Sequence, residues 1–257
     1  MKLKIIKTIV LFLILSNWAV AQTIPAIMVE YQKKYTGFVG TEMLYAQKDH
    51  AWYVIQPKKV NQAGTTKIDE KDDMHGIITF KTDDIKPAKY FQKIDNPTMY
   101  YEAYIENKPY LVTDSVPEMQ WQLIPGQTRQ IGNYTCNKAE LQFRGTTMVA
   151  YYAPDLPISF GPLKFKGLPG VILELYAKDH PEFGWLASKI SYPYTQPNTY
   201  TFNDKDEKIS IKNYVALLDK QSKTKFNVIM SRAPKGTQFS NIKIYRPGIE
   251  QVFEWEK

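Results

Sequence analysis

The chain has 257 residues and a formal net charge of +7 at pH 7, and 14% of its residues are aromatic. Its basic residues are scattered and arginines are few, which argues against a dedicated nucleic-acid-binding protein. Tyrosine, with 18 copies, is the most frequent aromatic residue. Because tyrosine fits a pleated, half-buried surface, this composition favours strands.

The first 21 residues are predicted to be a signal peptide that is cleaved on export. Three lysines precede an apolar run at residues 9–15, which is much shorter than the roughly 20 residues needed to cross a bilayer. Ala19 and Ala21 are small residues at the positions that a signal peptidase recognises, so we expect cleavage before Gln22. The alternative is an uncleaved amino-terminal anchor. We expect a periplasmic or otherwise exported protein whose mature chain lacks a transmembrane segment.

Short strands are predicted at the start of the mature chain. Residues 27–35, 42–47 and 50–56 are typical of a hairpin meander, with a tight turn at residues 48–49. Residues 57–74 are polar and are predicted to form a long surface loop.

Strand-like runs resume after this loop. A longer strand is predicted over residues 134–143, in which Ala139 and Leu141 face one side and Cys136 the other. A turn at Gly145 leads into the next strand. The other runs are residues 76–81, 90–93, 99–105, 110–113, 121–124, 127–131 and 147–152.

One helix is predicted in the carboxy-terminal third. Ile211, Val215 and Leu218 fall on one helical face, and Ser210 is a suitable N-cap. The helix is expected to end near residues 220–223.

These elements predict a mainly β fold, built as a curved antiparallel sheet or a partly open barrel or sandwich with one helix in the carboxy-terminal region. We expect a single β-rich domain at residues 22–232 after the leader at residues 1–21. Residues 233–257 are rich in Pro, Gly, Lys and Asn, and are expected to be a loosely held tail or an edge strand.

The most informative stretch runs from residue 150 to residue 176. Its four prolines fix φ at intervals and bias the preceding residues toward extended backbone, which excludes a helix. Pro169 and Gly170 suit the two central positions of a type II turn. After this turn, Val171, Leu173 and Leu175 are predicted to face one side of a strand.

The run Gly167-Leu168-Pro169-Gly170-Val171-Ile172 resembles the motif of the GLPGLI family of exported bacterial proteins, with valine in place of the usual leucine. The family's Asn-Pro-Ile-Glu-like tail is replaced by Arg246-Pro247-Gly248-Ile249-Glu250. The resemblance implies a place in the envelope of a Gram-negative bacterium and, since the family's function is unknown, no catalytic residues. It covers residues 121–176 in order and spacing, through Trp121, Leu123, residues 131–139, Ala150-Tyr151-Tyr152, Leu156-Pro157-Ile158 and Gly161-Pro162.

Two interpretations of the motif are open. In the first, its glycines and prolines specify a turn and a kinked crossover that the fold requires. In the second, its apolar turn and two preceding phenylalanines form a docking surface for another envelope protein. A charged residue in place of Leu168 would discriminate between them by its effects on folding and binding. The candidate binding residues are Phe160, Phe165, Gly167, Leu168, Pro169 and Gly170.

No catalytic residue, cofactor or metal site is predicted. Cys136 is the single cysteine and is expected to be buried, with a nucleophile or an intermolecular disulfide as alternatives. A Cys–His hydrolase would need Cys136 beside His50, His75 or His180, which lie in separate segments. The nearest approach to a metal-ligand cluster is residues 179–182, predicted to be a polar loop between two strands.

Two functions from different classes are consistent with these patterns. The first is a non-catalytic binding or scaffold module for an apolar ligand or an outer-membrane partner, because aromatic-rich strands occur without a catalytic constellation. The alternative is an envelope hydrolase with an unidentified site, which would be marked by a cleft containing residues of perturbed pKa. A purely structural role in the envelope is a third possibility.

Overall fold

The computed structural model describes residues 25–34, 41–56, 87–195, 200–231, 246 and 248–257. These residues form one sheet of 12 strands that does not close into a barrel, together with a helix near the carboxy terminus. The mainly β prediction and the position of the helix are confirmed. No helix in the described part of the chain has the length and hydropathy needed to span a bilayer.

The sheet is built from two meanders of antiparallel strands. Its spatial order is β12-β6-β5-β4-β3-β2-β1-β11-β10-β9-β8-β7, and only the pairing of β12 with β6 is parallel. The helix α2 spans Ile211–Ser231 and a short 3-10 helix, η3, spans Glu254–Glu256. The strands are β1 (Ala26–Lys34), β2 (Thr41–Ala46), β3 (His50–Gln56), β4 (Ala88–Lys93), β5 (Thr98–Ile105), β6 (Lys108–Ser115), β7 (Gln122–Ile131), β8 (Tyr134–Phe143), β9 (Thr146–Ala153), β10 (Val171–Ala177), β11 (His180–Tyr194) and β12 (Glu207–Ser210).

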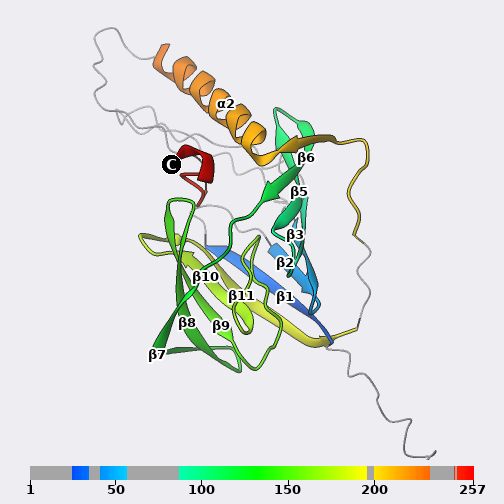
Figure 1. Cartoon of the computed structure of the whole chain (residues 1–257), viewed down its shortest axis with the longest axis vertical. Helices are drawn as coiled ribbons and strands as arrows, with labels where there is room; N and C mark the ends of the chain where they lie inside the picture. Colours follow the sequence, from blue (N-terminus) through cyan, green and yellow to red (C-terminus); the bar gives the residue numbers. More distant parts are fainter. Residues whose placement is uncertain (1–24, 35–40, 57–86, 196–199, 232–245, 247) are drawn as a thin grey trace, which may run out of the picture.

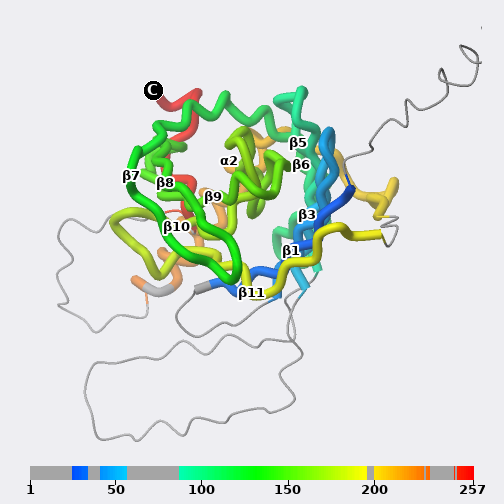
Figure 2. The backbone as a smooth tube through the Cα atoms, turned by 90° about the horizontal axis from the view of Figure 1, so that it is seen from below, coloured from blue at the N-terminus to red at the C-terminus, as the bar shows by residue number. Residues whose placement is uncertain are grey.

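The two meanders are joined through β1 and β11, which pair from Ala26 opposite Tyr194 to Lys34 opposite Gly184. In Figure 1 the strands β2, β3, β5 and β6 stand to the right and β7 to β10 run across the lower left, with β1 and β11 between them. The sheet therefore curves, and Figure 2 shows the curve from below. The helix α2 contacts β6 and β12.

Several strands differ from the sequence-based expectation. The two runs predicted at residues 121–124 and 127–131 form the single strand β7, which is interrupted by a bulge between Ile124 and Thr128. The strand β11 was not predicted, although it is the longest of the described strands. The predicted strand at residues 76–81 and the loop at residues 57–74 lie outside the described residues.

The helix α2 is longer than expected, because it ends at Ser231 rather than near residues 220–223. Residues 221–231 contain neither glycine nor proline, so nothing in their backbone chemistry stops the helix. The cap was predicted correctly, since the Ser210 hydroxyl oxygen accepts a hydrogen bond from the backbone N–H of Asn213 at 3.3 Å.

The core lies on the concave side of the sheet, where the connection between β9 and β10 packs. We call this connection, residues 154–170, the inner segment. Figure 2 shows it inside the curve of the sheet. The inner segment and both meanders contribute to one hydrophobic cluster. The apolar side chains of the inner segment that are at most 1% exposed are Leu156, Ile158, Phe160, Phe165 and Leu168.

The end of the chain packs against the sheet and the helix α2. Residues 248–257 form no strand, and Phe253 is buried beside Ile211 and Val215 of α2. The tail or edge strand expected at residues 233–257 stays a prediction, because most of its other residues lie outside the described part of the chain. We call residues 248–257 the C-terminal segment. Residues 232–245 lie outside the described residues, and the boundary predicted at residue 232 stays a prediction.

Candidate functional site

The turn of the motif depends on two glycines. Gly167 has a φ of +95° and Gly170 a φ of +155°, values that other residues rarely adopt. A Cβ on Gly170 would lie 2.1 Å from the carbonyl oxygen of Ala153, so the close approach of two backbone segments also requires glycine. The predicted type II turn is not formed. The φ of Gly170 is far from the value of about +80° that this turn needs, and the N–H of Val171 donates to the carbonyl of Leu156 at 3.1 Å.

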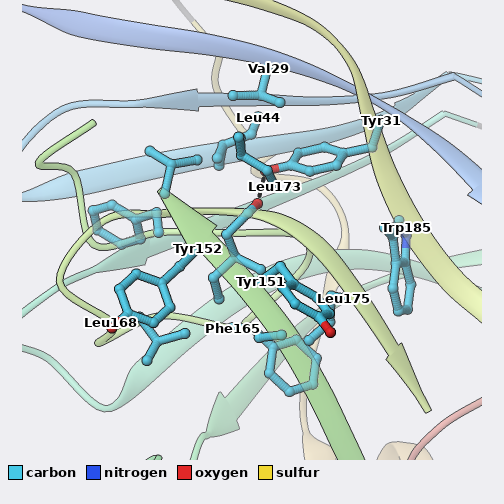
Figure 3. Close-up of a cluster of buried hydrophobic side chains, with 14 of the residues drawn as sticks. Val29, Tyr31, Leu44, Tyr151, Tyr152, Phe165, Leu168, Leu173, Leu175 and Trp185 are labelled. Atoms are coloured by element: carbon cyan, nitrogen blue, oxygen red, sulfur yellow. Dashed lines mark hydrogen bonds between the residues drawn. The ribbon is translucent and has the colours of Figure 1, made fainter. Parts of the chain in front are cut away.

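The predicted docking side chains point into the core. Phe160 and Phe165 are fully buried and Leu168 is 1% exposed. The ring of Phe165 lies 5.1 Å from that of Phe143 and 6.2 Å from that of Trp121, measured between centroids. Figure 3 draws Phe165 and Leu168 among the buried side chains of β1, β9 and β10. This placement favours the packed-turn interpretation, and docking through these side chains stays a prediction that would require the inner segment to move.

A network of buried charges ties the inner segment to the rest of the fold. Arg144, in the β8–β9 turn, donates two hydrogen bonds to Asp114 of β6, at 2.7 and 3.0 Å. Lys164 of the inner segment donates to Asp114 at 2.7 Å and to Glu250 at 2.9 Å. Glu250 also accepts a hydrogen bond from Arg144 at 2.5 Å. We call Asp114, Arg144, Lys164 and Glu250 the ion cluster.

Within the ion cluster, Asp114 and Lys164 keep their charges although both are buried. Burial alone would raise the pKa of Asp114, but Lys164 and Arg144 outweigh it and hold this pKa below its ordinary value. Burial alone would lower the pKa of Lys164, but Glu250 and Asp114 raise it above its ordinary value. Four segments that are distant in sequence therefore each supply one charge to a mutually satisfied set.

A second buried carboxylate lies on the β1–β3 side of the sheet. Glu42 is 2% exposed, and its Oε2 accepts hydrogen bonds from the hydroxyl of Tyr53 at 2.6 Å and the indole N–H of Trp185 at 2.7 Å. Lys33 lies 3.6 Å from its other oxygen and 5.4 Å from the Trp185 ring centroid. The two donors and the nearby lysine give the oxygens of this buried side chain polar partners.

The single cysteine is poorly suited to nucleophilic chemistry. Cys136 is fully buried, as predicted. Burial raises the pKa of its thiol to about 11, so the reactive thiolate is rare at neutral pH. His50 pairs with Asp49 and His180 with Glu182, whereas His75 lies outside the described residues.

Two cavities border the described residues; none of the four ion-cluster residues lines either of them, although Gly145 and Ile249, which line the first, adjoin Arg144 and Glu250 in the sequence. One of about 590 Å³ lies between the β8–β9 and β10–β11 turns and the C-terminal segment, lined by Ala177, Asp179, His180, Phe183 and Ile249, among others. A second of about 550 Å³ borders Lys89 and Glu102, on β4 and β5. Within the part of the chain that the structure covers, no group of three or more His, Cys, Asp or Glu could hold a metal ion.

The strand β7 ends the sheet and presents the most exposed edge of the described residues. Eight of its ten residues are exposed, and Leu123 is 50% exposed. β8 pairs with one edge of β7, and no described strand pairs with the other. Pro125 and the bulge before Thr128 interrupt this edge, and Arg129 forms an ion pair with Glu174 of β10.

These features define a class of protein: a curved, mostly antiparallel sheet whose concave side is filled by its own proline- and glycine-rich connection. The family model described as "Protein of unknown function (Porph_ging)" matches residues 141–174, which include β9, the inner segment and the start of β10. In a comparison with curated proteins, no significant match was found.

Two solved structures of PNGF-II are similar to this chain at 13% sequence identity. The structure in space group P21 has a TM-score of 0.52 and is matched over 77% of this chain and 34% of its own. The structure in space group C2 has a TM-score of 0.48, with 77% and 33% covered. At this identity the likeness concerns the fold alone, and this chain spans about a third of the PNGF-II chain.

Sequence reasoning missed the ion cluster and the Glu42 site. One signal was available, because Lys164 stands between Pro162 and Phe165 in an otherwise apolar, turn-rich stretch. A buried lysine needs a buried carboxylate. The sequence did not show which carboxylate, since Asp114 lies 50 positions before Lys164 and Glu250 lies 86 positions after it.

Proposed function

We propose that this chain is an exported envelope protein of the GLPGLI family that acts as a non-catalytic binding or scaffold module for an outer-membrane partner. The leader at residues 1–21 supports export, and the Gly167–Ile172 motif supports the family. The match to a family of unknown function at residues 141–174 covers the same stretch.

The open edge of β7 carries the proposal. An unpaired strand edge offers main-chain N–H and C=O groups, which an extended segment of another protein can pair with. Leu123 adds a large apolar side chain, half of it exposed, to this edge. The sheet order places β7 at the end opposite β12 and the helix α2 that follows it, so a partner can reach β7 without disturbing either.

The inner segment makes a partner protein a better candidate than an apolar ligand. The concave side of a curved sheet is where an apolar ligand would bind. In this chain the inner segment places Phe160, Phe165 and Leu168 there. An apolar ligand would have to displace these side chains, whereas a protein that adds a strand to β7 would not.

Photo-crosslinking in cells tests the proposal. A photoreactive residue replaces Leu123 on β7 and, as the control, Tyr100 on β5, which is 37% exposed. We expect a discrete adduct with one envelope protein from position 123 and none from position 100. The absence of an adduct at position 123, or the same adducts from both positions, would contradict docking at β7. Recovery of the protein from the cytosol with Met1 attached would contradict export.

A further inference from the structure

The C-terminal segment is held on the β8–β9 turn by main-chain hydrogen bonds. The backbone N–H groups of Gln251 and Val252 donate to the carbonyl oxygen of Arg144 at 2.8 and 2.9 Å. The hydroxyl of Thr146 donates to the carbonyl oxygen of Ile249 at 2.6 Å. These bonds place Glu250 within reach of the ion cluster.

The same segment reaches the inner segment and the helix. Glu250 bonds Lys164, the charged residue of the inner segment that is buried against the sheet. The guanidinium of Arg144 lies 4.6 Å from the ring centroid of Phe253, whose side chain is buried. Arg246, just before the C-terminal segment, pairs with Asp219 of α2. The C-terminal segment therefore connects the β8–β9 turn, the inner segment and the helix α2.

The inner segment makes many of its main-chain hydrogen bonds within itself. Gly161 donates to Phe165, Phe165 to Pro162 and Gly167 to Ser159, at 2.9 to 3.2 Å. Its described hydrogen bonds to β4 and to residues 94–121 each use at least one side chain; for example, the side-chain amide of Gln92 donates to the carbonyl oxygen of Leu163. Leaving the concave side would break the two main-chain hydrogen bonds that Val171 and Ile172 of β10 donate to Leu156 and Phe160 at 3.1 Å, but it would leave the strand-to-strand pairing of the sheet in place.

We propose that the C-terminal segment is an ionic strap, which locks the inner segment in the concave side of the sheet through Glu250. Loss of Glu250 leaves Arg144 and Lys164 with one buried carboxylate, Asp114, between them. Lys164 then leaves its buried position more easily, because a buried charge is stable only when it is paired. Release of the strap is the step that uncovers the apolar concave side.

Limited trypsin digestion of the full chain tests the strap with three variants. Glu250→Gln removes the charge that contacts Lys164. Glu254→Gln is the matched control, because Glu254 is 40% exposed and contacts only Arg144 among the ion-cluster residues, at 3.2 Å. Thr146→Val removes the bond to Ile249 and leaves the ion cluster intact. Cleavage after Lys164 reports departure of the inner segment, and cleavage after Lys189, in the middle of the sheet, reports global unfolding.

We expect Glu250→Gln to accelerate cleavage after Lys164, relative to cleavage after Lys189, by at least about tenfold, because the substitution removes one charge from a hydrogen-bonded ion pair. Thr146→Val should act in the same direction by a smaller factor, and Glu254→Gln should change the ratio by less than about twofold. Equal acceleration at both lysines would overturn the proposal, because it would show that Glu250 supports the whole fold. An unchanged ratio in Glu250→Gln and Thr146→Val would also overturn it. If Glu250→Gln does not fold, Thr146→Val alone decides between these outcomes.

Discussion

Replacement of Phe165 by alanine tests whether the inner segment is part of the core. The Phe165 side chain is fully buried, with ring contacts to Phe143 and Trp121. Truncating a buried phenylalanine to alanine costs about 3–5 kcal/mol, from lost transfer free energy and the cavity that remains. A domain of this size loses 2–4 °C per kcal/mol, so the melting temperature should fall by roughly 6–20 °C.

Urea denaturation of the purified protein, followed by circular dichroism, measures the loss in free energy of unfolding. The midpoint should fall while the dependence of the free energy of unfolding on urea concentration stays constant, because the fold is the same. Leu123→Ala on the exposed edge of β7 is the matched control and should change stability by less than about 0.5 kcal/mol. A cost below about 1 kcal/mol for Phe165→Ala would refute the packing of the inner segment.

Three further predictions concern the turn, the ion cluster and the thiol. Gly170→Ala should lower the free energy of unfolding, measured by urea denaturation, by at least about 3 kcal/mol. Gly132→Ala, whose Cβ would meet nothing within 4 Å, should lower it by about 1 kcal/mol. Equal losses in the two variants would contradict the clash with Ala153. Asp114→Asn should cost about 3–5 kcal/mol. The folded state lowers the pKa of Asp114, so the wild-type protein should also lose stability as the pH falls below about 4. A melting temperature that is the same at pH 6 and pH 3 would contradict this pH dependence. The Cys136 thiol should resist iodoacetamide in the native protein and react fully in urea; rapid native alkylation would show that it is accessible.

Local sequence patterns predicted much of the secondary structure. Alternating residues and turn signals located β8 at residues 134–143, and Ser210 marked the start of α2. The end of α2 was missed, because the expectation followed the apolar face and not the absence of helix-breaking residues. The strand β11 was missed, because Pro181, Gly184 and Pro193 suggest loops, whereas β1 and β10 hold this segment as a strand.

The candidate site was predicted only in part. The glycines and prolines of residues 167–170 were expected to form a turn, and they do, although with different geometry. The burial of Phe160 and Phe165 was not predicted, since an apolar side chain in a turn-rich segment can face the core or solvent. The ion cluster could not be assigned, because its partners lie 30 to 106 positions apart in the sequence.

The sequence alone determined the extended, sharply turned backbone at residues 150–176, because proline and glycine restrict φ locally whatever surrounds them. It also determined the predominance of strands. The tertiary structure alone decided that β1 pairs with β11, that the inner segment fills the concave side, and that Glu250 meets Lys164. These contacts join residues far apart in the chain, and their free energy comes from burial and charge pairing, which exist only after the sheet has curved around the inner segment.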